Sequence, residues 1–268
     1  MRKLLISFVL FCLILAFFGC SSNKVSKEEK KEISKTTIYK PENVKVPKWI
    51  FEKLEEGDFV IGISPKSFDY DKMVDASKGM AAVIKGRNTG SYSISKYASQ
   101  NAGEDDAYAE FELNVSSSIE EVKRIYNSLN LIDETYLYGF FIGLYSMKEC
   151  EIEKAFVNIS ELTEPEWISE EEMIVTDEVI LSKAFATSIN LDIAWEKAAE
   201  NARIEMGKFL EKDVQGLLKS TDEKIDKSVA VETTIKTCKM DITRSHIVAN
   251  IKDGLFSYKV FIEMKMER

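Results

Sequence analysis

A pattern that occurs twice, about 120 residues apart, is the feature that most constrains the fold. The run Pro47-Lys48-Trp49-Ile50 recurs 118 residues later as Pro165-Glu166-Trp167-Ile168. A second block follows 122 residues on, where Met73, Ala76, Ser77, Met80 and Ile84 match Trp195, Ala198, Ala199, Ala202 and Met206. A third block follows 120 residues on, where Asn130, Asp133, Tyr138, Phe141 and Ile142 match Asn250, Asp253, Tyr258, Phe261 and Ile262. Three blocks in one order with similar offsets indicate a duplicated unit.

The spacing within the blocks predicts the same elements in each half. The second block has the i, i+3, i+4, i+7 spacing of one helix face, which predicts helices over residues 71–85 and 190–211. Short apolar stretches before them, at 59–63 and 179–186, predict strands. Asp253-Gly254, between alternating runs at 242–251 and 255–266, predicts a hairpin. The matched hairpin of the first half would join 125–132 to 136–144 through Asp133-Glu134.

We therefore expect an α+β fold of two tandem repeats, residues 47–150 and 160–268. Each repeat would be an antiparallel sheet with an amphipathic helix packed on one face. Trp49, Trp167, Trp195, Ala198 and Ala202 are the expected core positions of these repeats. Each half is large enough for a core of its own.

The first twenty residues have the features of a secretory signal. Arg2 and Lys3 precede an apolar run from Leu4 to Phe18, which is shorter than the roughly 20 residues of a membrane-spanning helix. The run ends in Phe17-Phe18-Gly19-Cys20, which resembles a bacterial lipobox. We therefore expect cleavage of residues 1–19 and lipid attachment, such as palmitate, at Cys20. Ser21 after it favours the outer membrane over the inner, with the body facing the periplasm or the cell surface.

The segment after the anchor is polar, and the chain as a whole has more acidic than basic residues. Residues 20–46 are rich in Ser, Lys and Glu and predict a disordered tether. The whole chain has a formal charge of −9, and loss of Arg2 and Lys3 with the signal would bring it to −11. This charge argues against nucleic acid as a partner.

The lipobox, charged tether, Pro-x-Trp start and Ala-rich helix followed by a hairpin resemble one known family. The chain resembles the Lpp-twenty-type bacterial outer-membrane lipoproteins, whose repeat is similar to the N-terminal domain of flagellar assembly protein T. The resemblance rests on Pro165, Trp167, Ala198, Ala199, Ala202 and Arg203, and more loosely on Pro47, Trp49, Ala76 and Met80. It implies an envelope-anchored structural or adaptor role with an envelope protein as partner, and it implies no catalytic residues.

The sequence contains no nucleophile elbow, phosphate-binding loop or HExxH motif, so we expect no catalytic residue, metal or cofactor. His246, the one histidine, has no evident partners for catalysis or metal binding. Cys150 and Cys238 could pair, although a single pair is weak evidence for a disulfide. Trp49 and Trp167 could line a ligand groove, but we expect each to fill its own core. Two functions remain open: a non-enzymatic structural or adaptor lipoprotein, or a lipoprotein that binds a small molecule or peptidoglycan in the cleft between the repeats.

Overall fold

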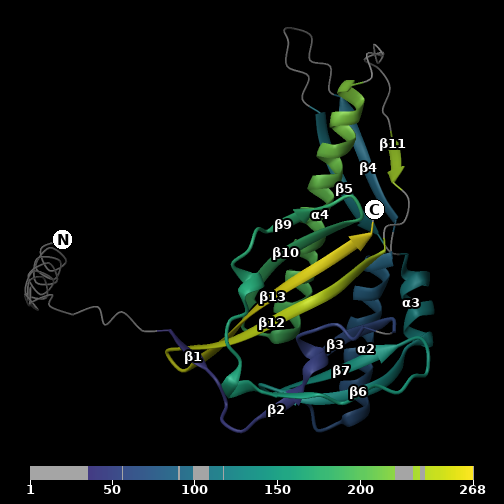
Figure 1. Ribbon diagram of the computed structural model, residues 1–268. Coiled ribbons are helices and arrows are strands. Elements are labelled where there is room, and N and C mark those ends of the chain that lie inside the picture. Colours follow the sequence, from purple (N-terminus) through teal and green to yellow (C-terminus); the bar gives the residue numbers. More distant parts are fainter. Residues whose placement is uncertain are drawn as a thin grey trace, which may run out of the picture. The chain divides into compact units, whose positions relative to one another are not determined.

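The computed structural model describes residues 36–55, 57–89, 91–98, 109–116, 118–220, 232–235 and 239–267. Residues 36–268 form one compact unit. The fold is a mixed α+β structure whose sheets are antiparallel (Figure 1). Within the described residues, no helix is long and apolar enough to span a membrane.

One three-stranded sheet is built from the first half of the chain. Its elements are β3 (Phe59–Pro65), α2 (Tyr70–Thr89), β6 (Asn130–Leu137) and β7 (Phe140–Ser146), and its strand order is β3-β7-β6. Helix α2 packs on β3 and β7, where the Tyr145 hydroxyl contacts the Val74 carbonyl and the Ser77 hydroxyl at 3.1 Å each. Helix α3 (Ile119–Ser128) lies beside α2. Its N-cap is Ser118, whose side chain accepts a hydrogen bond from the Glu121 amide.

A five-stranded sheet is built mainly from the second half. Its elements are β1 (Thr37–Tyr39), β9 (Met173–Val175), β10 (Val179–Ser188), β12 (Met240–Lys252) and β13 (Leu255–Glu267), in the order β1-β12-β13-β10-β9. Helix α4 (Leu191–Ser220) packs on β10 and β13. Small residues on its buried face, among them Ala194, Ala198, Ala199 and Ala202, let it lie close to the strands.

Short elements complete the chain. They are β2 (Lys45–Pro47) paired with β8 (Phe156–Asn158), the 3-10 helices η1 (Lys48–Ile50), η2 (Ile159–Glu161) and η3 (Glu166–Ile168), and a sheet of β4 (Ser91–Ala98), β5 (Ala109–Ser116) and β11 (Glu232–Ile235) in the order β11-β4-β5.

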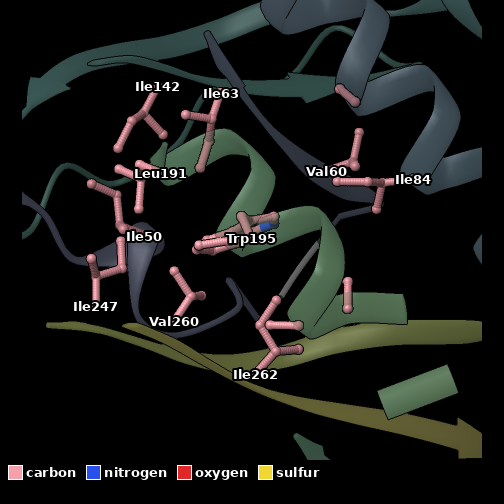
Figure 2. Packing of buried hydrophobic residues seen from close by; sticks show 14 of the residues in the cluster. Ile50, Val60, Ile63, Ile84, Ile142, Leu191, Trp195, Ile247, Val260 and Ile262 are labelled. Atoms are coloured by element: carbon pink, nitrogen blue, oxygen red, sulfur yellow. The ribbon is translucent and has the colours of Figure 1, made fainter. Parts of the chain in front are cut away.

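The hydrophobic core is shared by both halves. Leu191 and Trp195 of α4 lie between Ile63 and Ile142 on one side and Val260 on the other (Figure 2). The first part of α4 is therefore covered by both sheets. Although the sequence predicts one core for each repeat, the buried apolar residues of the two halves form one continuous cluster.

Both hairpins turn on two residues with positive φ. These are Tyr138 and Gly139 (52° and 82°) between β6 and β7, and Asp253 and Gly254 (53° and 77°) between β12 and β13. Type I′ turns require positive φ at both positions, and glycine adopts it without strain. The hairpin predicted at Asp253-Gly254 is thus confirmed.

The predicted hairpin at Asp133-Glu134 is wrong. Both residues lie inside β6, and residues 125–128 belong to α3. The matching by 120 residues placed Asp133 opposite Asp253, but the observed turns are 115 residues apart, at Gly139 and Gly254. The sequence also predicted disorder through residue 46, whereas Thr37–Tyr39 and Lys45–Pro47 are strands. Backbone pairing with β12 and β8 orders these residues without burying them all.

Candidate docking groove

A hollow runs along the outer edge of β10. It has a volume of about 610 Å³. One wall is α4, with Asn201, Ile204, Glu205 and Lys208, and the other is η3 and the following chain, with Trp167, Ile168, Glu170 and Glu172. Strands β10 and β13 supply Lys183, Ala184, Phe185 and Phe261 between them. The groove is thus a strand edge set between a helix and a loop.

The strand edge is open because β9 is short. Strand β9 pairs with β10 only from Ile180 to Ser182, and the Lys183 amide then donates to the Glu172 carbonyl at 2.7 Å. No other strand among the described residues pairs with residues 184–188 of β10 on this side. Such an edge can pair with the backbone of another chain.

The direction of the backbone groups along this edge follows from two contacts. The Lys183 amide points outward to Glu172, and the Phe185 carbonyl points outward to the Asn201 side-chain amide at 3.0 Å. Since successive residues of a strand alternate, the Thr187 amide and carbonyl point outward as well. The edge at Thr187 is therefore ready to donate and accept hydrogen bonds.

An exposed aromatic pair lies beside the open edge. Phe185 is 52% exposed, and its ring centroid lies 5.7 Å from that of Phe261 on β13. Lys259 Nζ lies 4.2 Å from the centroid of the first ring and 4.4 Å from the second. An ammonium group over an aromatic face is attracted by the ring quadrupole. This gives the face of the sheet an apolar surface with a positive charge above it.

The groove carries charges of both signs, and they are paired. Lys183, whose side chain is buried, contacts Glu170 at 2.7 Å, and Lys208 contacts Glu205 at 2.6 Å. The hydrogen bond from Lys183 lowers the pKa of the Glu170 carboxyl.

Trp167 forms part of the wall and packs against an ion pair of which the acid, Glu263, is buried. The Arg244 guanidinium lies 5.3 Å from the centre of its ring. Arg244 Nε donates to Glu263 Oε1 at 2.7 Å, and this hydrogen bond raises the pKa of Arg244. Although Trp167 borders the groove, its side chain is 7% exposed and serves mainly as packing.

The region between the two halves holds a much smaller cavity. Trp49, Ile84, Asn88, Trp195 and Ser245 are among its lining residues, and its volume is about 40 Å³. Small-molecule sites usually have volumes of about 300–1,000 Å³. The cavity has space for water-sized occupants only.

The residues singled out from the sequence are distributed over both places. Trp49, Trp195, Ala198 and Ala202 are buried in the shared core, and Trp167 lies at the wall of the groove. Cys20 lies outside the described residues. Cys150 is exposed and unpaired, and Cys238 lies outside the described residues.

The sequence analysis missed Phe185, Lys259 and Phe261 as a surface. A signal was present, because Phe185 shares its strand face with Lys183 and Thr187, where polar residues are usual. His246 lies opposite Phe261 in the register and is buried, and this burial lowers the pKa of its imidazole. Among the described residues, no group of three or more His, Cys, Asp or Glu side chains is arranged to hold a metal ion.

Comparisons with protein families, with curated proteins and with solved structures find no match for this chain. The resemblance to the Lpp-twenty-type lipoproteins stays an expectation from the sequence.

Proposed function

We propose that this chain is a lipid-anchored protein of a bacterial cell envelope that binds an extended segment of a partner protein along β10, without catalysing a reaction. The observation that carries the proposal is the open edge of β10 beside the exposed Phe185 and Phe261 rings. The anchor rests on the lipobox-like run that ends at Cys20. An outer-membrane location is part of the same proposal.

An extended peptide fits this groove better than a folded surface does. A strand added to the edge would pair with the outward backbone groups of Thr187. Side chains on one face of that strand would meet Ile204 and α4, and those on the other would meet Phe185. Main-chain pairing would supply affinity, while the apolar pockets and paired charges would select the sequence.

The small-molecule alternative places its ligand between the two halves. The cavity there is about 40 Å³, and the polar Asn88 side chain is engaged by Arg203 Nη1 at 2.7 Å. The geometry therefore favours the adaptor function over a ligand site at this position.

We also infer that the two halves arose by duplication. Three observations support this. The first two are that the strand orders β3-β7-β6 and β10-β13-β12 are the same, and that in each half a helix follows the first strand. The third is that β6 and β12, which come second in chain order in their sets, each have an irregularity in their register, at Leu131/Asp133 and at Ile242/Arg244.

A site-specific photocrosslinker tests the groove in intact cells. We expect a benzophenone amino acid at Phe185 to capture one protein, and peptide mapping to place the bond in one extended segment of it. The same reporter at Ile119, an exposed position on α3, is the control. Equal capture from both positions would contradict the groove.

A proline at the edge tests the pairing itself. Thr187→Pro removes an outward amide, and proline is tolerated at such edge positions. We expect it to abolish capture at Phe185, while Thr187→Val keeps it. Capture that survives Thr187→Pro would show that backbone pairing is not used. Fatty-acid labelling that is lost in Cys20→Ala tests the anchor separately.

A further inference from the structure

An apolar tip lies at the end of the five-stranded sheet where the described chain begins. We define the apolar tip as Ile38, Tyr39, Leu255 and Phe256, from β1 and from the turn end of β13 (Figure 1). All four side chains are exposed, Leu255 by 73% and Ile38 by 58%. Large apolar side chains gathered at one exposed place need a partner to cover them.

These side chains point to both faces of the hairpin. Ile38 lies opposite Asn250, and Leu255 lies opposite Lys252, so both lie on one face. Tyr39 lies opposite Ala249, and Phe256 lies opposite Ile251, so both lie on the other face. A surface for docking another protein side-on would be apolar on one face. Apolar residues on both faces suit end-on insertion into an apolar layer.

An aromatic cluster joins the tip to the body of the fold. The Tyr39 and Phe256 ring centroids are 5.3 Å apart, and Tyr39 lies 6.2 Å from Tyr138 in the β6–β7 turn. Tyr138 in turn lies 5.8 Å from Tyr258, which is buried. The exposed rings therefore pack against the body of the fold through Tyr138 and Tyr258.

The position and composition of the tip point to one partner. We propose that the apolar tip inserts at the boundary between headgroups and acyl chains of the lipid surface that carries the anchor, a proposal that rests on lipidation of Cys20. Only residues 21–35 separate Cys20 from Thr36, and a random coil of that length has an end-to-end distance of roughly 20–25 Å. Tyrosine and other aromatic residues are enriched at membrane–water interfaces.

Quenching by brominated lipid tests this proposal on the processed full chain. Phe256→Trp places a reporter at the tip, where residue 256 is 40% exposed, and Val175→Trp places one at a position that is 39% exposed. Val175 pairs with Ile180, which pairs with Met266, so it lies at the other end of the same sheet. Both variants are reconstituted in phosphatidylcholine and phosphatidylglycerol vesicles with and without brominated acyl chains. The parent chain provides the background of Trp49, Trp167 and Trp195.

We expect Phe256→Trp to lose most of its added emission in brominated vesicles, and Val175→Trp to keep it. A Leu255→Asp change in the Phe256→Trp chain should restore the emission without altering the circular dichroism. Equal emission of Phe256→Trp in both kinds of vesicle would overturn the insertion of the apolar tip into lipid. The mass of the Cys20 peptide, measured on the same sample, reports lipidation independently. Quenching in a sample whose Cys20 is unmodified would contradict the lipid anchor and would still support insertion of the apolar tip.

Discussion

Trp49 Nε1 donates a hydrogen bond of 3.0 Å to Asp133 Oδ2, which joins η1 to the register irregularity in β6. Trp167, the matching residue of the second half, lies over Arg244 at the corresponding irregularity in β12. Each tryptophan thus joins a 3-10 helix, η1 or η3, to a strand, β6 or β12. The partner is an acid in one half and a base in the other.

Trp49→Phe is expected to destabilise the chain. The change keeps most of the apolar contact but removes the donor to Asp133, whose side chain is nearly buried. Loss of a hydrogen bond to a buried charged group costs roughly 1–3 kcal/mol. Denaturant unfolding of the detergent-purified chain measures the loss. In a chain that already carries Asp133→Asn, the Trp49→Phe change should cost less; an equal cost in both backgrounds would show that the pair does not interact.

Asp133 should make stability depend on acid pH. Burial alone would raise the pKa of this carboxyl, but hydrogen bonds from Lys154 and Trp49 hold the pKa below its ordinary value of 3.8. A carboxyl with a lowered folded pKa stabilises the fold above its unfolded pKa, and the stabilisation disappears as the pH falls through the folded pKa. Between neutral pH and pH about 3, the free energy of unfolding of Asp133→Asn should therefore fall less steeply than that of the parent. Equal pH dependence of the free energy of unfolding in Asp133→Asn and in the parent would contradict this role of the Asp133 carboxylate.

Two glycines of the first half should respond oppositely to alanine. A Cβ at Gly62 would overlap the backbone oxygen of Ser77, because α2 crosses β3 at this point. A Cβ at Gly79, inside α2, would meet nothing within 4 Å. Gly79→Ala should stabilise the chain by about 0.5–1 kcal/mol through helix propensity. Gly62→Ala should lower the melting temperature, since the helix must move away from the sheet. A stabilising Gly62→Ala would show that the helix moves freely.

Periodicity predicted the elements that carry a full apolar stripe. The helix face from Trp195 to Met206 is buried as expected, and the Asp253-Gly254 turn lies where predicted. The first hairpin was misplaced because Tyr138 has a positive φ, which is uncommon for tyrosine and which the sequence therefore did not predict. The order of β1 depends on pairing with β12, 210 residues away, and a local composition cannot reveal it. The groove depends in the same way on where β9 ends.

Trp167→Ala and Phe185→Ala should separate packing from binding. Trp167 is buried against Arg244, so its truncation removes core contacts and uncovers the Arg244–Glu263 pair; the expected cost is roughly 3–5 kcal/mol. Phe185 is half exposed, so its truncation should change the melting temperature little and yet weaken the capture of the partner by a crosslinker at Thr187. Thermal melting and crosslinking on the same two variants give both readouts. An unchanged melting temperature for Trp167→Ala would make Trp167 a binding residue of the groove, and full capture by Phe185→Ala would remove the aromatic pair from the binding surface.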